Sequence, residues 1–315
     1  MKHIWPLTGR AFALVLSLAL LSGCSVKLMS WQEEIELGNE AAPQFLAEGG
    51  GQVPDQEVVA YVREIGTRLV AGVDHSQLPE DLVWEFHVLD SSVINAFALP
   101  GGKVFMSRGL MEKMTNEAQL AGVLGHEIGH VTRRHGNQRI SQAMLIQFGV
   151  VGLAVAGSLS DSEWAQMIGL GAAAGGQLYL LKYTRDQETE ADFYGVQYMA
   201  AAGYNPVGQV QVMEILREAS GGQGGPEWLS THPAPDTRIS DLQRLIVRDY
   251  PDFDKPGAYV FRQDEFQSNI LARLRSLPPP RHGSPNAMVG PEAFEALTGI
   301  AWGQIEHVGC DCKKH

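Results

Sequence analysis

The sequence has few cysteines and little positive charge. Lysine and arginine total 24 against 36 acidic residues, which gives a formal net charge of −12. Such an acidic chain is poorly suited to binding nucleic acid or to electrostatic attraction to anionic lipid. Two of its three cysteines, Cys310 and Cys312, lie close together near the end of the sequence. They could pair across a strained small ring, pair with another chain or bind metal with flanking histidines, but we expect a tail with none of these roles.

The first 23 residues have the pattern of a secretory signal peptide. A short basic start precedes an apolar run at 11–21, which is too short for a comfortable membrane span, and Leu-Ser-Gly-Cys follows at 21–24. This end resembles the lipobox of bacterial lipoproteins, which implies cleavage before Cys24 and lipid attachment to it. The alternatives are an uncleaved anchor or a plain signal peptide with an incidental cysteine. By the same resemblance, Ser25 favours the outer membrane, so we expect a lipid anchor at its periplasmic face.

A second apolar stretch covers residues 143–181. Residues 144–160 and 164–181 carry no formal charge, and their lengths approach that of a membrane span. Seven glycines interrupt these two runs, which lowers helix propensity and apolar area. We expect two apolar helices that form a hairpin beside the functional site, as a lid or a membrane-touching element. A true membrane hairpin is the alternative.

The most informative segment is NEAQLAGVLGHEIGHVTRRH, residues 116–135. Two histidines four apart on a helix, His126 and His130, project from one face and can reach a single metal ion, with Glu127 beside them. This pattern is typical of zinc hydrolases, in which the glutamate is the general base and later the proton donor to the leaving amine. The alternative is a core helix with two hydrogen-bonded histidines.

The surroundings of this motif favour a helix. An apolar stripe runs beside the histidine face, and Asn116 with Gln119 resembles a capping box at the start. A metzincin would have a third histidine at 136, where this chain has glycine. His135 falls off the ligand face, and we expect it at the surface.

The third ligand is expected in the charged helical segment 182–202. Glu188 and Asp192 are four apart and share a face, whereas Glu190 points away from it. Glu188 is therefore the predicted ligand, and Asp192 is placed one turn along to orient a ligand imidazole. The alternative is a solvated acidic helix face, which the two histidines make less favourable.

A hairpin is predicted just before the metal-binding helix. Two short β-type runs, 94–99 and 103–107, flank the Pro-Gly-Gly turn at 100–102. An exposed edge strand here could pair with an extended peptide through its backbone, with Asn95, Ala96, Phe97 and Ala98 as the binding residues. An ordinary structural hairpin fits these residues equally well.

One further histidine follows a glycine-rich connection at 221–226. His232 lies in a proline-rich loop and could reach the metal site, and Arg238 opens the helix that runs to about residue 250. A surface histidine in a loop is the alternative.

The expected fold is mainly α with a small β-sheet, an α+β fold. With 44% hydrophobic residues the chain can form a sizeable core. Periodicity predicts helices at 31–47, 58–70, 207–219 and 263–274, a short one at 291–305, and strands at 82–89 and 258–261.

At four places the chain resembles the zinc metallopeptidases of family 48, gluzincins that include the CAAX prenyl endopeptidases, HtpX-type and Oma-type proteases and periplasmic assembly proteases. The matching segments are NAFALPGG at 95–102, HEIGH at 126–130, ETEAD at 188–192 and THPAPDTRI at 231–239. The resemblance implies one zinc ion held by His126, His130 and Glu188, with Asp192 supporting a ligand. It further implies that His232 lies near the site, to stabilise the oxyanion or to cap the zinc at rest, and that Arg238 supports it. The same resemblance tips the balance toward a substrate-binding edge strand.

The resemblance favours the lipid-anchored periplasmic branch of this family. It implies a peptidase domain at 24–250, followed by an extension at 251–315 of unknown role. The expected substrates are unfolded or misassembled polypeptides, outer-membrane proteins among them, and the outer-membrane assembly machinery is a possible partner. The competing hypothesis is a chaperone-like assembly factor that hardly cleaves, against which the intact Glu127 argues.

Overall fold

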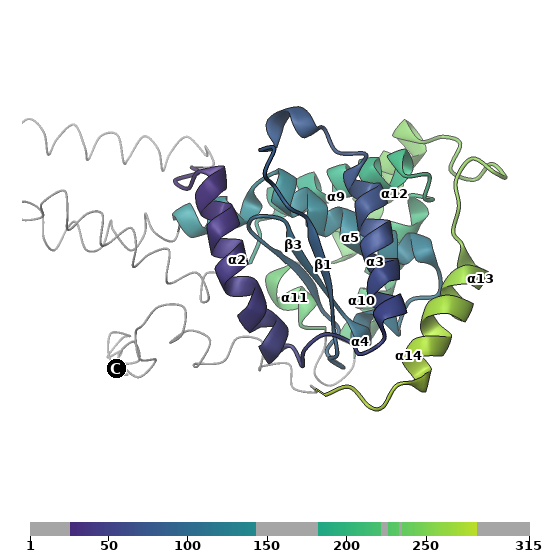
Figure 1. Cartoon of the computed structure of the whole chain (residues 1–315). Coiled ribbons are helices and arrows are strands. Elements are labelled where there is room, and N and C mark those ends of the chain that lie inside the picture. The colour runs from purple at the N-terminus through teal and green to yellow at the C-terminus, as the bar shows by residue number, and fades with distance from the viewer. Residues whose placement is uncertain (1–25, 143–181, 222–225, 233–234, 282–315) are drawn as a thin grey trace, which may run out of the picture.

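The computed structural model describes residues 26–142, 182–221, 226–232 and 235–281 (Figure 1). Cys24 and its leader, the apolar segment 143–181, the helix expected at 291–305 and the tail with its two cysteines lie outside the described residues. Within the described part, no helix has the length and apolar character needed to cross a membrane. Helices dominate and one small sheet is present, which confirms the expected fold class.

The sheet has three strands, β1 (Glu85–Leu89), β2 (Ala96–Leu99) and β3 (Lys103–Ser107). Their order is β1-β3-β2, with β3 antiparallel to β2 and parallel to β1. The predicted hairpin is confirmed, and Gly101 and Gly102 in its turn have φ values of 73° and 81°. Glycine adopts these positive values without strain, so the Pro-Gly-Gly turn allows β2 to return as β3.

Alternate side chains of the strands enter two different cores. The helix α2 (Trp31–Glu48) covers one face of the sheet, where Phe45 packs against Phe97 and Phe105. The helices α3 (Gln56–Val70) and α5 (Glu117–Thr132) cover the other face (Figure 1). The sheet is thus a buried middle layer, which is why every residue of β2 and β3 is buried.

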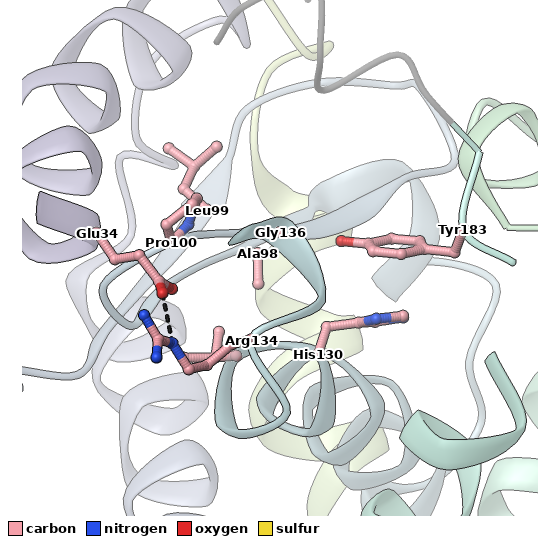
Figure 2. A pocket seen from close by; sticks show the side chains of 9 residues that line it. Glu34, Ala98, Leu99, Pro100, His130, Arg134, Gly136 and Tyr183 are labelled. Carbon is pink, nitrogen blue, oxygen red and sulfur yellow. Dashed lines mark hydrogen bonds and ion pairs between the residues drawn. The ribbon is translucent and has the colours of Figure 1, made fainter. Parts of the chain in front are cut away.

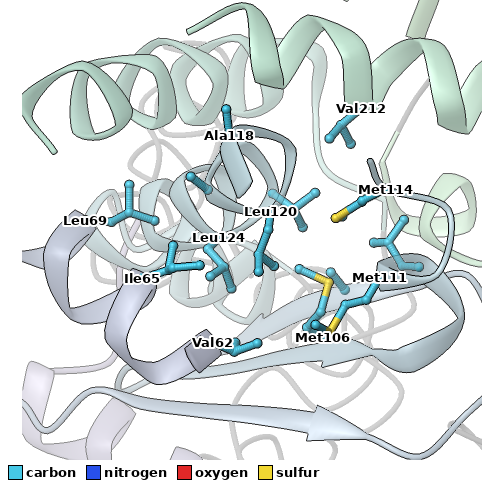
Figure 3. Close-up of a cluster of buried hydrophobic side chains, with 14 of the residues drawn as sticks. Val62, Ile65, Leu69, Met106, Met111, Met114, Ala118, Leu120, Leu124 and Val212 are labelled. Carbon is cyan, nitrogen blue, oxygen red and sulfur yellow. The ribbon is translucent and has the colours of Figure 1, made fainter. Parts of the chain in front are cut away.

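The larger core lies around α5. Figure 3 shows Val62, Ile65 and Leu69 of α3 facing Leu120 and Leu124 of α5. Met106 of β3 and Met111, the last residue of the short helix α4 (Arg108–Met111), lie below them in this view. Because α9 (Arg185–Ala201) and α10 (Val207–Ser220) cover the rest of α5, all of its residues from Glu117 to Val131 are buried.

The start of α5 matches the predicted cap only in part. The Asn116 side chain accepts a hydrogen bond from the backbone N–H of Gln119 at 3.0 Å. The Gln119 side chain does not return this bond to Asn116 but accepts from the backbone N–H of Thr115 at 2.7 Å. The helix therefore begins where expected with one half of a capping box.

Other described elements are η1 (His75–Gln77), α11 (Trp228–Thr231), α12 (Pro235–Asp249), α13 (Gln263–Phe266), η2 (Gln267–Leu271) and α14 (Ala272–Ser276), and the described residues 135–142 are also helical. The elements α13, η2 and α14 join into one helical segment with a π-helical middle, at the place where a helix was predicted. The strand expected at 258–261 is wrong, because Val260 makes only a single bridge, to Tyr204. Residues after 250 still belong to the body, since Phe266, Ile270 and Leu274 lie in the larger core.

Candidate metal centre

Four buried side chains meet between α5, α9 and α11. They are His126, His130, Glu188 and His232, and one ligand atom from each lies within 4.8 Å of all the others. Nε2 of His126 and Nε2 of His130 are 3.0 Å apart. Nε2 of His130 lies 3.4 Å from Oε1 of Glu188, and Nε2 of His232 lies 4.0 Å from the same oxygen. The structure thus brings together both predicted histidines, the predicted carboxylate and the histidine of the loop.

The donor set fits a divalent cation such as zinc. Oε1 of Glu188 and Nε2 of His232 are buried and have no hydrogen-bond partner, although each can accept one. Burial lowers the pKa of His130 and of His232 well below the usual range, so both imidazoles are neutral, as metal binding requires. Burial also raises the pKa of Glu188 to about 8, despite the nearby Arg238. A cation among these atoms would favour the ionised carboxylate and use the unpaired acceptors.

Asp192 fixes the orientation of His126. Its Oδ1 lies 2.9 Å from Nδ1 of His126, so that nitrogen carries the proton and Nε2 keeps its lone pair for the cluster. Arg238 donates to both oxygens of Asp192, at 2.6 and 2.7 Å, and also to Glu188. Gln209 also donates a hydrogen bond to Asp192, at 2.8 Å. Although burial opposes ionisation, Arg238 and the other donors keep the pKa of Asp192 well below its usual range.

Glu127 faces the cluster from α5 and is covered by Trp228. Its side chain is 0% exposed, and burial raises its pKa to about 7. The indole Nε1–H of Trp228 donates to Oε1 of Glu127 at 3.5 Å, whereas Oε2 of Glu127 has no partner. The indole also stacks on the His232 ring, with centroids 4.2 Å apart and planes 2° from parallel. A carboxyl group with a pKa near neutrality can both accept and donate a proton.

Sequence reasoning did not single out Trp228 or Tyr183. The Tyr183 ring stacks on His130 with centroids 3.8 Å apart, and its backbone N–H donates to the carbonyl of Thr231 at 2.9 Å. A small pocket lies beside these rings and is lined in part by Ala98 and Leu99 of the edge strand (Figure 2). An aromatic residue four positions before His232 was the available signal for Trp228, but no pattern in the sequence pointed to Tyr183.

The expectation for His135 is wrong. Its side chain is 0% exposed instead of lying at the surface. It contacts His130 on one side and Glu190 on the other, at 2.9 and 3.0 Å. Glu190 lies outside the four-residue cluster, as its position two residues from Glu188 predicts. A hydrogen bond from His135 lowers the pKa of Glu190 to about 2, helped by Arg133.

The segment expected to bind substrate forms the edge strand of the sheet. Asn95 precedes β2, and its backbone exchanges hydrogen bonds with Ser107 at 2.9 and 3.0 Å. Ala96, Phe97 and Ala98 point into the two cores, and β2 packs against α5. Only β3 pairs with β2 within the described sheet, so the other backbone edge of β2 is that of an edge strand.

Comparison with known proteins gives matches over most of this region. Residues 57–246 match the pattern of peptidase family M48. The chain is 31% identical over 278 residues to a beta-barrel assembly-enhancing protease from Yersinia pestis, covering 86% of this chain and 53% of that protein. It is 30% identical over 263 residues to the protein of the same name from Escherichia coli K12, with 77% and 52% covered. It is 32% identical over 253 residues to the mitochondrial metalloendopeptidase OMA1 of Bos taurus, with 78% and 46% covered. The chain spans about half the length of these curated relatives.

Proposed function

Because the chain belongs to peptidase family M48, we propose that it is a zinc-dependent endopeptidase with His126, His130 and Glu188 as its metal ligands. The observation that carries the proposal is the convergence of these three side chains on one buried point, with Glu127 beside them. Zinc held there would act as a Lewis acid and lower the pKa of a bound water to about 7. Asp192 and Arg238 orient His126 and Glu188 for this role.

Glu127 is the proposed catalytic base. It takes a proton from the attacking water and passes it to the nitrogen of the leaving amine, which a carboxyl group with a pKa of about 7 can do in both directions. An extended substrate would add to the sheet along the edge strand β2, at Asn95, Ala96, Phe97 and Ala98, which brings its backbone next to α5.

The described arrangement is closed to a substrate. Glu127 and His232 are 0% and 1% exposed, and Trp228 covers both of them. We propose that α11, which carries Trp228, moves away when a polypeptide reaches Glu127. We propose that His232 takes the fourth ligand position in this closed form, because its unpartnered Nε2 already lies among the other ligand atoms.

The proposed substrates are unfolded or misassembled polypeptides of the bacterial cell envelope, including outer-membrane proteins. Two of the relatives are named beta-barrel assembly-enhancing proteases, and the leader with Cys24 supports a lipid anchor at the periplasmic face of the outer membrane. We place the peptidase domain at 24–250, with the described residues 251–281 packed against it. The alternative is an assembly factor that binds the same clients and contacts the assembly machinery with little proteolysis.

Glu127→Gln tests the proposed activity. The amide keeps the size of the side chain but cannot accept a proton, so cleavage of an unfolded outer-membrane protein should fall about 10²-fold or more, with zinc content unchanged. Peptide release and metal content of the purified chain measure the two effects. Glu36→Gln on the surface of α2 is the matched control and should cleave normally. Equal cleavage by the Glu127→Gln variant would favour the assembly-factor alternative. A polypeptide that stays bound to this variant in cells would identify the substrate.

A further inference from the structure

His135 connects His130 to the carboxylate of Glu190. Nδ1 of His135 lies 2.9 Å from Nδ1 of His130, and Nε2 of His135 lies 3.0 Å from Oε2 of Glu190. The His135 side chain is fully buried, whereas that of Glu190 is 36% exposed. The three groups therefore form a chain that runs from the protein surface to the candidate metal centre.

The protons in this chain can be placed from its geometry. Glu190 is ion-paired with Arg133 at 2.6 Å, so it is a carboxylate and can only accept. His135 must then donate from Nε2, and a neutral His135 has only a lone pair left on Nδ1. The facing Nδ1 of His130 therefore carries the proton that these two nitrogens share. This leaves the lone pair of His130 on Nε2.

Nε2 is the atom of His130 that faces the other ligands. It lies 3.0 Å from Nε2 of His126 and 3.4 Å from Oε1 of Glu188. His126 reaches the same state by a direct contact with the carboxylate of Asp192. Different partners thus fix the tautomers of the two histidines of this motif. A carboxylate fixes that of His126, and an imidazole that itself contacts a carboxylate fixes that of His130.

The turn after α5 holds His135 in place. Arg134 has a left-handed backbone, with φ at 58°, so the chain turns back over the end of the helix. Its guanidinium contacts Glu34 at 2.6 Å, which Figure 2 shows, and the carbonyl of Met29 at 2.5 Å. A non-glycine residue in this conformation is uncommon, and here two contacts to the α2 region hold it.

We propose that His135 and Glu190 are positioning residues that keep His130 in its Nδ1–H form and thereby set the metal affinity of the site. This inference rests on the proposed metal centre, because a tautomer matters to the function only if Nε2 binds a metal. Groups that orient a metal-ligating histidine typically change metal affinity 10- to 100-fold when they are replaced.

Two substitutions interrupt the hydrogen-bonded series from His130 through His135 to Glu190 at different points. His135→Phe removes the acceptor next to His130 and keeps an aromatic ring in the buried space. Glu190→Gln acts at a partly exposed position and allows an amide N–H to donate to Nε2 of His135. The His135 proton would then lie on Nδ1, and the His130 proton on Nε2. Asp186→Asn is the matched control, because Asp186 is an exposed acidic residue one turn before Glu190 on α9 and lies outside the chain of protons.

The first readout is the tautomer of His130 in the full, metal-free chain, from the ¹⁵N shifts of its ring. We expect the Nδ1–H form in the wild type and the control, and a large share of Nε2–H in His135→Phe and Glu190→Gln. The second readout is zinc affinity by competition with a chelator. Affinity should fall roughly 10- to 100-fold in the two variants and stay within about twofold in the control.

Other outcomes overturn the proposal. If His130 keeps its Nδ1–H form in both variants, or if zinc affinity does not change when the tautomer does, His135 and Glu190 do not position the ligand. A lower melting temperature with an unchanged tautomer would assign them a structural role only. A wild-type protein that binds no zinc would instead refute the proposed metal centre. The tautomer measurement would still show whether His135 and Glu190 fix the proton of His130.

Discussion

Single residues decide the charge balance of the buried site. The carboxylates of Glu127, Glu188 and Asp192 lie in or beside the cluster, and Arg238 is the described guanidinium that bonds directly to two of them. The neighbouring imidazoles of His130 and His232 are kept neutral by burial. Three buried carboxylates carry more negative charge than the guanidinium of Arg238 can balance, which costs free energy. A divalent cation would neutralise the excess. The residues therefore suit a bound metal better than a dry core.

His232→Ala tests whether this histidine restrains the enzyme. Its Nε2 lies among the ligand atoms and its ring stacks on Trp228, so removing it should free one ligand position and loosen the cover over Glu127. We expect basal cleavage of an unfolded substrate to rise several-fold. Initial rates with purified protein measure this, and His75→Ala on the exposed η1 is the control. A fall in kcat of about 10²-fold or more would instead mean that His232 stabilises the transition state.

At the scale of elements, small residues set the distance between the two helices that carry the proposed metal ligands His126, His130 and Glu188. A Cβ atom added at Gly129 of α5 would lie 2.9 Å from the carbonyl oxygen of Ala191 in α9. A Cβ atom at Gly125 would lie 3.0 Å from the carbonyl of Gly195. The backbones therefore approach closely between the histidines and Glu188. The glycine inside HEIGH thus serves this helix packing.

Gly129→Ala should disturb the metal site without changing any ligand. The added methyl group must push α9 away from α5, which we expect to cost about 1–3 kcal/mol of stability. It also moves Glu188 relative to His130, so zinc affinity should fall together with the melting temperature. Gly221→Ala at the end of α10 is the control, because its added Cβ would meet only an ordinary contact at 3.6 Å. Unchanged zinc affinity in the Gly129 variant would contradict this account of the helix crossing.

Local patterns predicted the elements, and long-range contacts explain what they missed. The period of apolar residues predicted α5, and the spacing of Glu188 and Asp192 predicted the face of α9 that meets it. His135 was misplaced because the helical period was continued through it, whereas α5 ends at Thr132 and the left-handed turn at Arg134 brings His135 back. The contact of Trp228 with Glu127 joins residues 101 positions apart, which no local pattern encodes.

At the scale of the whole molecule, the last described segment packs onto the body near the start of α5, where the backbone N–H of Ala118 donates to the carbonyl of Phe261 at 3.2 Å. Phe266, Ile270 and Leu274 enter the same core as α3 and α5. Arg108, after β3, donates to the carbonyls of Leu274 and Pro278, both at 2.7 Å. The chain therefore wraps back onto its own middle, so the folding of α5 and the packing of residues 263–278 support each other.

Phe266→Ala tests this coupling. The side chain is 0% exposed, and its loss leaves a cavity in the core that also holds α5, so we expect a cost of about 3–5 kcal/mol. The free energy of unfolding from denaturant titration measures it. Gln267→Ala, exposed at the next position, should change stability by less than about 0.5 kcal/mol. If residues 251–281 formed a separate unit, the Phe266 variant would unfold in two steps and leave the transition of the peptidase body unchanged. A single transition at lower denaturant, with zinc released at the same point, is the result expected for one shared core.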